Sequence, residues 1–212
     1  TMLKAGFDKK CVTPPAGAPL AGFAARQGGS TGVHDELYAR ALVLDDGARA
    51  VAVVAVDVLG LPAAFVDRVR GMITARTPIA AEGTLIACTH THAAPITIRT
   101  FFNPEESVDA AYMDSLARAI TEAVAGAFEN RTPARAGCGT GRVTGLGVNR
   151  RTPSGTPVDE QAGILKVDGE DGRTPGVLVN YACHPTVLGP DNLLVTGDFP
   201  ATTIERLERT LG

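Results

Sequence analysis

The sequence predicts an α/β fold in which helices pack on the faces of a mixed β-sheet. Three observations support this: apolar runs of strand length, segments with apolar residues at helical spacing, and Gly, Pro or Asp-Gly turns between them. Strands and helices alternate along the chain, but some strands follow one another directly, which favours a mixed sheet. At 212 residues the chain is expected to form a single domain over residues 1–212.

The first half of the chain contains a predicted hairpin followed by a helix. A short strand is expected at 3–7, and residues 12–32 hold so many Pro and Gly residues that we expect a long surface loop, a kind of segment that is often functional. Residues 37–47 and 49–60 are predicted strands around an Asp-Gly turn. Residues 62–76 open on a proline and place apolar residues at helical spacing, which predicts a helix.

The second half adds two helices and several strands. The clearest element is the helix over 107–128, because Tyr112, Leu116, Ile120 and Val124 share one stripe. The predicted elements are a strand over 84–88, the helix over 107–128 with Ser107 as N-cap, a Gly-rich strand-like stretch over 134–151, strands over 162–172 and 175–183, and a helix over 199–211 capped by Asp198.

Composition excludes several classes of protein. Hydrophobic residues make up 44%, charged residues 20% and the net charge is -3, so we expect a globular protein with no nucleic-acid partner. No apolar run reaches the roughly 18 to 20 residues of a transmembrane segment, and the start lacks a signal peptide, so a cytoplasmic location is expected. The four cysteines form no CxxC pair, and neither a G-x-S-x-G nor a Walker motif is present. The sequence carries no signal for an oligomeric state.

Three predicted strands end on conspicuous polar residues. VAVVAVD ends at Asp57, TLIACTHTH at His90 and His92, and GVLVNYACH at His184. Ligands of α/β proteins bind beyond the carboxyl ends of the strands, so these side chains would converge if the three strands run parallel. The sequence therefore predicts a functional site at this edge.

The spacing of His90 and His92 points to a shared cleft. In an extended segment residues i and i+2 face the same way, and neutral imidazole is a common zinc ligand. A hydrogen-bonded strand end would explain the same pair, and His184 at a second strand end favours the metal site.

Other polar residues have two open explanations each. His34 is a second-shell or substrate-binding candidate or a loop residue, and Asp57 either orients a ligating histidine or caps a turn. Arg150 could hold an anionic group or remain solvated, and Asp198 is expected to be a helix cap more than a site residue.

Five segments together resemble a known family. They are VTPPAGAPLAGF, GVHDELYARALVLDDG, CTHTHAAP, GVNRR and NYACHPTVLGPDNLLVTGDFP, in this order. They resemble the N-terminal half of the neutral, non-lysosomal ceramidases, and more closely the shorter bacterial ceramidase-like proteins. The resemblance implies a zinc-dependent amidase that splits the N-acyl bond of ceramide, a lipid amide, into a fatty acid and sphingosine; a soluble amide is the alternative substrate.

The resemblance also assigns roles to the histidines. It implies that His90 and His184 ligate Zn²⁺ and that His92 sits beside the metal as a catalytic group. It further implies that a glutamate and a tyrosine from the family's C-terminal half ligate the zinc, and that a serine in a Gly-Asp-Val-Ser-Pro-like segment, soon after the last helix of this chain, lies close to the metal. This chain is expected to stop before that segment, so we expect weak or absent zinc binding and no activity from residues 1–212 alone.

Two other functions remain open on the residues alone. One is a metal-dependent amidohydrolase of a different class, which builds its site on an eight-stranded barrel and fits 212 residues poorly. The other is a non-catalytic or inactive fragment whose histidines are structural.

Overall fold

The computed structural model confirms the predicted α/β class, a seven-stranded mixed sheet with helices packed against it. The structure describes residues 2–100 and 107–211. The strands of the large sheet lie in the order β5-β4-β3-β1-β6-β7-β8, and a small parallel sheet pairs β2 with β9. The strands are β1 (Lys4–Cys11), β2 (Gly32–Val33), β3 (Tyr38–Asp45), β4 (Ala50–Val56), β5 (Thr84–Cys88), β6 (Thr132–Arg142), β7 (Gln161–Gly169), β8 (Gly176–Tyr181) and β9 (Leu194–Val195). The helices are α1 (Ala63–Arg76), α2 (Ala110–Glu129), α3 (Asp198–Leu211) and the short 3₁₀ helix η1 (Ala81–Gly83).

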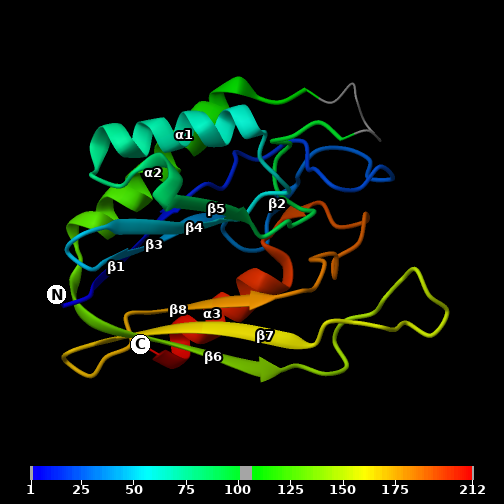
Figure 1. Cartoon of the computed structure of the whole chain (residues 1–212). Helices are drawn as coiled ribbons and strands as arrows, with labels where there is room; N and C mark the ends of the chain where they lie inside the picture. Colours follow the sequence, from blue (N-terminus) through cyan, green and yellow to red (C-terminus); the bar gives the residue numbers. More distant parts are fainter. Residues whose placement is uncertain (1, 101–106, 212) are drawn as a thin grey trace.

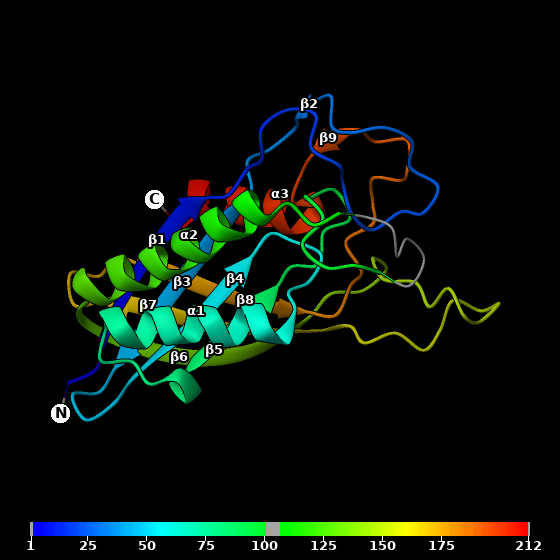
Figure 2. The ribbon, with the colours of Figure 1, turned by 90° about the horizontal axis from the view of Figure 1, so that it is seen from above.

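The large sheet folds into two layers at one weak junction. β1 and β6 pair only through Lys4 with Pro133 and Ala5 with Thr132, near the start of both strands. Beyond this junction β6, β7 and β8 continue as a layer below β5, β4, β3 and β1, while α1 and α2 cover the upper face (Figure 1). The view from above shows α1 and α2 lying side by side over the strands (Figure 2).

The main core lies between the upper layer of β5, β4, β3 and β1 and the two covering helices. β3 and β4 form the predicted hairpin, and their alternate residues Val43 and Val54 are fully buried. They pack with Val69 of α1 and Ile120 of α2, which carry the helical stripes predicted from the sequence. A second, much smaller core of Ala5, Leu42, Ala134 and Val167 joins the two layers.

The predicted start of the second helix is wrong by three residues. Ser107 lies before the helix and does not cap it; the N-cap is Asp109, whose carboxylate accepts hydrogen bonds from the N–H groups of Ala111 at 2.8 Å and Tyr112 at 3.2 Å. Ser and Asp are both good caps, and the local sequence does not decide between two of them so close together.

The three strands predicted to end on polar residues, β4, β5 and β8, are not all parallel neighbours in the sheet. β4 and β5 are parallel partners, but β8 is at the opposite end of the strand order and pairs antiparallel with β7. The loop after β8 nevertheless reaches the turn after β5, where the rings of His184 and His90 stack, because the lower layer folds beneath the upper one (Figure 1). Among residues 2–100 and 107–211, no helix has the length and apolar character needed to cross a bilayer.

Candidate active site

His90 is placed by a turn that follows β5. β5 ends at Cys88, and the N–H groups of Thr89 and His90 then bond the carbonyls of Val56 (2.9 Å) and Val58 (3.1 Å). His90 has φ of 67°, in the left-handed region that non-glycine residues rarely adopt. The predicted extended geometry of the His-x-His pair is therefore wrong. The turn still brings the rings of His90 and His92 to 5.2 Å between centroids.

A backbone carbonyl sets the tautomer of His90. Its Nδ1 lies 2.5 Å from the carbonyl oxygen of Leu59, which can only accept, so Nδ1 carries the proton and donates it. The lone pair of the neutral ring is then on Nε2, the atom left for a metal or a substrate proton. The side chain is exposed, so this atom is accessible.

His92 is held by the long loop that precedes β2. The Phe23 ring packs edge-on against the imidazole at 4.9 Å, and Gly22 lies so close that a Cβ there would overlap the His92 ring. Gly22 has φ of 100°, which also requires glycine. The Nδ1 of His92 is buried against this backbone and has no hydrogen-bond partner of acceptable geometry in the described part of the chain.

His184 arrives from the lower layer, in the loop after β8. Its Nε2 lies 2.7 Å from Nε2 of His92, and its ring stacks on His90 at 5.1 Å with an interplanar angle of 29°. Two imidazole nitrogens on one tetrahedral zinc would lie about 3.3 Å apart, from Zn–N distances of about 2.0–2.1 Å. The 2.7 Å separation is therefore that of a hydrogen bond, in which one neutral imidazole donates to the other.

Hydrogen bonds between two distant segments fix the relative positions of the histidines. The hydroxyl of Thr91 donates to the Thr196 carbonyl at 2.7 Å, and the Thr196 N–H donates to the Ala93 carbonyl at 3.1 Å. The carboxylate of Asp35 accepts from the Thr196 hydroxyl and, at 2.8 Å, from the Gly197 N–H. Thr91 and Thr196 are buried, so these bonds are shielded from water.

The three histidines form a group that could hold a metal ion. One ring nitrogen of each lies within 4.8 Å of those of the other two, and in the residues described no Asp, Glu or Cys joins the group. Neutral imidazole is a common ligand of zinc, so histidines of this group could bind that metal. The tautomer of His90 leaves the lone pair of its Nε2 free, and Nε2 is also the atom by which His92 and His184 approach each other.

Burial and nearby positive charge favour the neutral form of His92 and His184. Burial lowers the pKa of His92 to about 4, with further lowering from His184, His90 and Arg26; the Gly22 backbone offsets part of it. Burial also lowers the pKa of His184, as do His90 and the positive charge of Arg150. Imidazoles that stay neutral can act as ligands, because a protonated ring has no lone pair to donate.

Asp198 and Arg150 lie near His184. The Asp198 carboxylate accepts a hydrogen bond from the Phe199 N–H at 2.7 Å, in the first turn of α3, as expected of a residue at a helix start. It also accepts from the N–H groups of Val187 (3.4 Å) and Leu188 (3.1 Å), so it holds the loop that carries His184 as well. The negative charge of Asp198 raises the pKa of His184, which opposes the lowering by the positive charge of Arg150. Arg150 is exposed, in the loop between β6 and β7.

His34 and Asp57 lie outside the histidine cluster. His34 is exposed after β2, and its Nδ1 lies 2.8 Å from a carboxylate oxygen of Asp35. Asp57 is fully buried, and its Oδ2 accepts from the Tyr38 N–H at 2.9 Å and from Nη1 of Arg40 at 2.5 Å. Asp57 therefore links β3 to the end of β4, which is neither of the roles expected from the sequence.

Three residues of the site were not singled out from the sequence. Gly22, Phe23 and Arg26 surround His92, and all belong to the long loop over 12–32. The only signal was the length of that loop, because long loops in compact domains are often functional.

Comparison with known proteins identifies the family and the fold of the chain. A model of the family described as neutral/alkaline non-lysosomal ceramidase, N-terminal, matches residues 4–211. The chain belongs to this ceramidase family. Two solved structures share its fold: a ceramidase complexed with C2 (TM-score 0.90, 20% identity) and the neutral ceramidase from Pseudomonas aeruginosa (TM-score 0.89, 21% identity). Each match covers 100% of this chain but 36% of the other, so this chain spans little more than a third of those ceramidases.

Proposed function

We propose that the protein containing this chain is a zinc-dependent amide hydrolase that cleaves an N-acyl bond, in a ceramide-like lipid or another linear amide. The observation that carries the proposal is the cluster of His90, His92 and His184, whose ring nitrogens lie within 4.8 Å of one another. Family membership supports a ceramidase-type reaction, and the mixed sheet excludes the eight-stranded barrel of the alternative amidohydrolase class.

His90 and His184 are the proposed metal ligands. The Leu59 carbonyl fixes His90 with Nε2 unprotonated, and Asp198 fixes the loop behind His184. When bound, zinc would polarise the substrate carbonyl and lower the pKa of a water molecule. In the family, the resemblance implies that a glutamate and a tyrosine from outside residues 1–212 complete the ligand set.

His92 is the proposed catalytic group. Phe23 and Gly22 hold its ring against rotation, and its Nε2 points to the same space as the proposed ligands. A neutral imidazole in this position can donate a hydrogen bond to the oxygen on which negative charge develops. Arg150, at the same rim, would attract a polar or anionic part of the substrate.

Zinc titration of the longer parent protein, which would carry the remaining ligands that the resemblance implies, tests the ligand assignment. We expect His90→Ala and His184→Ala each to weaken zinc binding by at least about tenfold, since each removes a directly bonded donor. His34→Ala is the matched control, because His34 is exposed and outside the cluster. Equal zinc affinity in all four proteins would refute the metal site.

Hydrolysis assays on the longer parent protein test the reaction. The His92→Ala variant should keep zinc binding close to the wild-type level and lose most of its kcat on an N-acyl substrate. Loss of zinc with unchanged turnover of the metal-free enzyme would contradict the proposal.

A further inference from the structure

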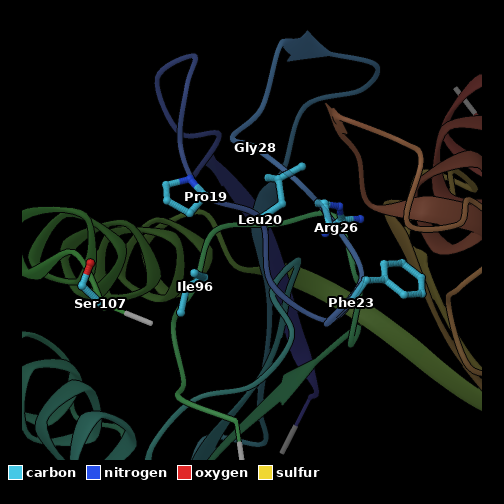
Figure 3. A pocket seen from close by; sticks show the side chains of 7 residues that line it. All are labelled: Pro19, Leu20, Phe23, Arg26, Gly28, Ile96 and Ser107. Carbon is cyan, nitrogen blue, oxygen red and sulfur yellow. The ribbon is translucent and has the colours of Figure 1, made fainter. Parts of the chain in front are cut away.

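Several contacts join the loop that holds His92 to the segment that leads into α3. Arg26 of this loop, which Figure 3 shows on the wall of a pocket, donates from Nε to the Asn192 carbonyl at 3.2 Å. β2 and β9 continue the contact as a short parallel pair. Because parallel strands advance in the same direction, Asp35, two residues after β2, meets Thr196, the residue after β9. The small sheet therefore delivers the Asp35 carboxylate to this segment.

The backbone of Thr196 holds the segment that carries His90 and His92. Its carbonyl accepts a hydrogen bond from the Thr91 hydroxyl at 2.7 Å, and its N–H donates to the Ala93 carbonyl at 3.1 Å. Thr91 precedes His92 and Ala93 follows it, so the two bonds fall on either side of this histidine. Thr91 and Thr196 are buried, so water does not compete for these bonds.

The hydroxyl of Thr196 joins two further groups in a fixed direction. The Asp198 N–H can only donate, and it donates to Oγ1 of Thr196 at 2.9 Å. The hydroxyl proton of Thr196 is then directed to the Asp35 carboxylate, which also accepts from the Gly197 N–H at 2.8 Å. Asp35 is therefore the acceptor at which this series of hydrogen bonds ends.

Asp198 extends the connection to His184. Its carboxylate accepts from the N–H groups of Val187 (3.4 Å) and Leu188 (3.1 Å), in the loop that follows His184. Asp198 has φ of 59°, and within residues 2–100 and 107–211 the other non-glycine residue with positive φ is His90, at 67°. Such a backbone conformation costs free energy and persists only where the surrounding structure holds it. Both ends of the histidine cluster therefore depend on the hydrogen bonds around them.

We propose that Asp35 is a positioning residue of the candidate active site and acts through Thr196. Its carboxylate orients the Thr196 hydroxyl, and Thr196 joins the backbone around His92 to the residue that holds the loop of His184. Asp35 is not a member of the histidine cluster, so it sets the relative positions of the rings and takes no part in the chemistry. Its importance for hydrolysis rests on the proposed function, whereas its effect on the rings does not.

NMR of the metal-free chain tests this role through the imidazole resonances of His92 and His184, whose Nε2 atoms lie 2.7 Å apart. Thr196→Val removes the hydroxyl with little change of shape and should shift the resonances of both rings. Thr196→Ser keeps the hydroxyl and should leave them close to their wild-type positions. Thr121→Val is the matched control, because the Thr121 hydroxyl is also buried but donates to the Ala117 carbonyl within α2, and it should leave both rings unchanged.

A substitution of Asp35 tests the other end of the connection. In Asp35→Asn an NH₂ group replaces one acceptor oxygen, so a donor faces either the Thr196 hydroxyl or the Gly197 N–H. This variant should shift the same two rings and, in the parent protein, weaken zinc binding about tenfold. His34→Ala removes the exposed partner of Asp35 and should change neither property, because exposed ion pairs contribute little.

Three results would each overturn the proposal. They are unchanged resonances of both rings in Thr196→Val and Asp35→Asn, equal shifts in Thr121→Val, and a zinc affinity of the parent protein that Asp35→Asn does not alter. If Thr196→Val fails to fold, Asp35→Asn decides, since the Asp35 side chain is 27% exposed and tolerates the change. The resonances are measured without metal, so a parent protein that binds no zinc would refute the proposed function and leave this test intact.

Discussion

The two layers of the molecule differ sharply in how they are packed, and the proposed site lies where they meet. The upper layer of β1, β3, β4 and β5 is covered by α1 and α2 and holds the main core. The lower layer of β6, β7 and β8 shares only a small core with it and exposes Ile164 and Val179. His90 and His92 follow the upper layer and His184 follows the lower one, so a well-packed and a sparsely packed part of the chain must hold one cluster together.

The largest expected effect comes from the same substitution in each layer. Ile120 of α2 is fully buried, whereas the Ile164 side chain of β7 is 39% exposed. Ile120→Ala should lower the free energy of unfolding by about 2–5 kcal/mol and Ile164→Ala by less than about 1 kcal/mol. Chemical denaturation of both variants measures this, and equal losses would show that the layers are equally packed.

A substitution of Asp57, at the end of β4, distinguishes a role in stability from a role in zinc binding. Asp57→Asn removes the charge that pairs with Arg40 and should lower the free energy of unfolding by about 1.5–3 kcal/mol. Zinc affinity should stay unchanged, since Asp57 bonds Tyr38 and Arg40 and not the histidines. If Asp57→Asn has normal stability but binds zinc more weakly, Asp57 contributes to the metal site and this interpretation is wrong.

Gly22 tests how firmly the long loop holds His92. Gly22→Ala places a Cβ into the His92 ring at a φ of 100°, so we expect a loss of about 1–3 kcal/mol from strain and a displaced imidazole. The NMR shifts of His92 should change while those of His34 remain. Gly28→Ala is the matched control: Gly28 also has positive φ, but open space surrounds it. Identical His92 shifts in the wild-type chain and in both variants would show that the loop does not position this residue.

A further test is a pH dependence. The folded pKa of His92, lowered by burial to about 4, is below its ordinary value of 6.5, so between these values the unfolded chain binds a proton that the folded chain does not. Stability of the metal-free chain should therefore fall as the pH drops from about 6.5 to 4, and His92→Gln should reduce this slope. His34→Gln supplies the comparison, and an undiminished slope in His92→Gln would place the titrating group elsewhere.

The sequence predicts the upper layer better than the lower one for a physical reason. The β3–β4 hairpin and the stripes of α1 and α2 are local patterns, and burial on one core enforces them. The folding of β6, β7 and β8 beneath the sheet depends on a junction of two residue pairs, which leaves no periodic signal.

The sequence predicts which histidines form the candidate site but not how their rings are held. Strand ends and the family resemblance singled out His90, His92 and His184, and the structure places all three together. The left-handed turn at His90 and the contacts of Phe23 and Arg26 with their surroundings arise from tertiary packing, so neither spacing nor composition indicates them.

The most direct test of the account is an anomalous difference map from crystals of the zinc-loaded protein. The account predicts a zinc peak about 2.0–2.1 Å from a ring nitrogen of both His90 and His184, with His92 beside it. A peak bound instead by His34 or the cysteines, or no peak at the histidine cluster at saturating zinc, would contradict the central claim that two layers of this chain meet to form a metal site.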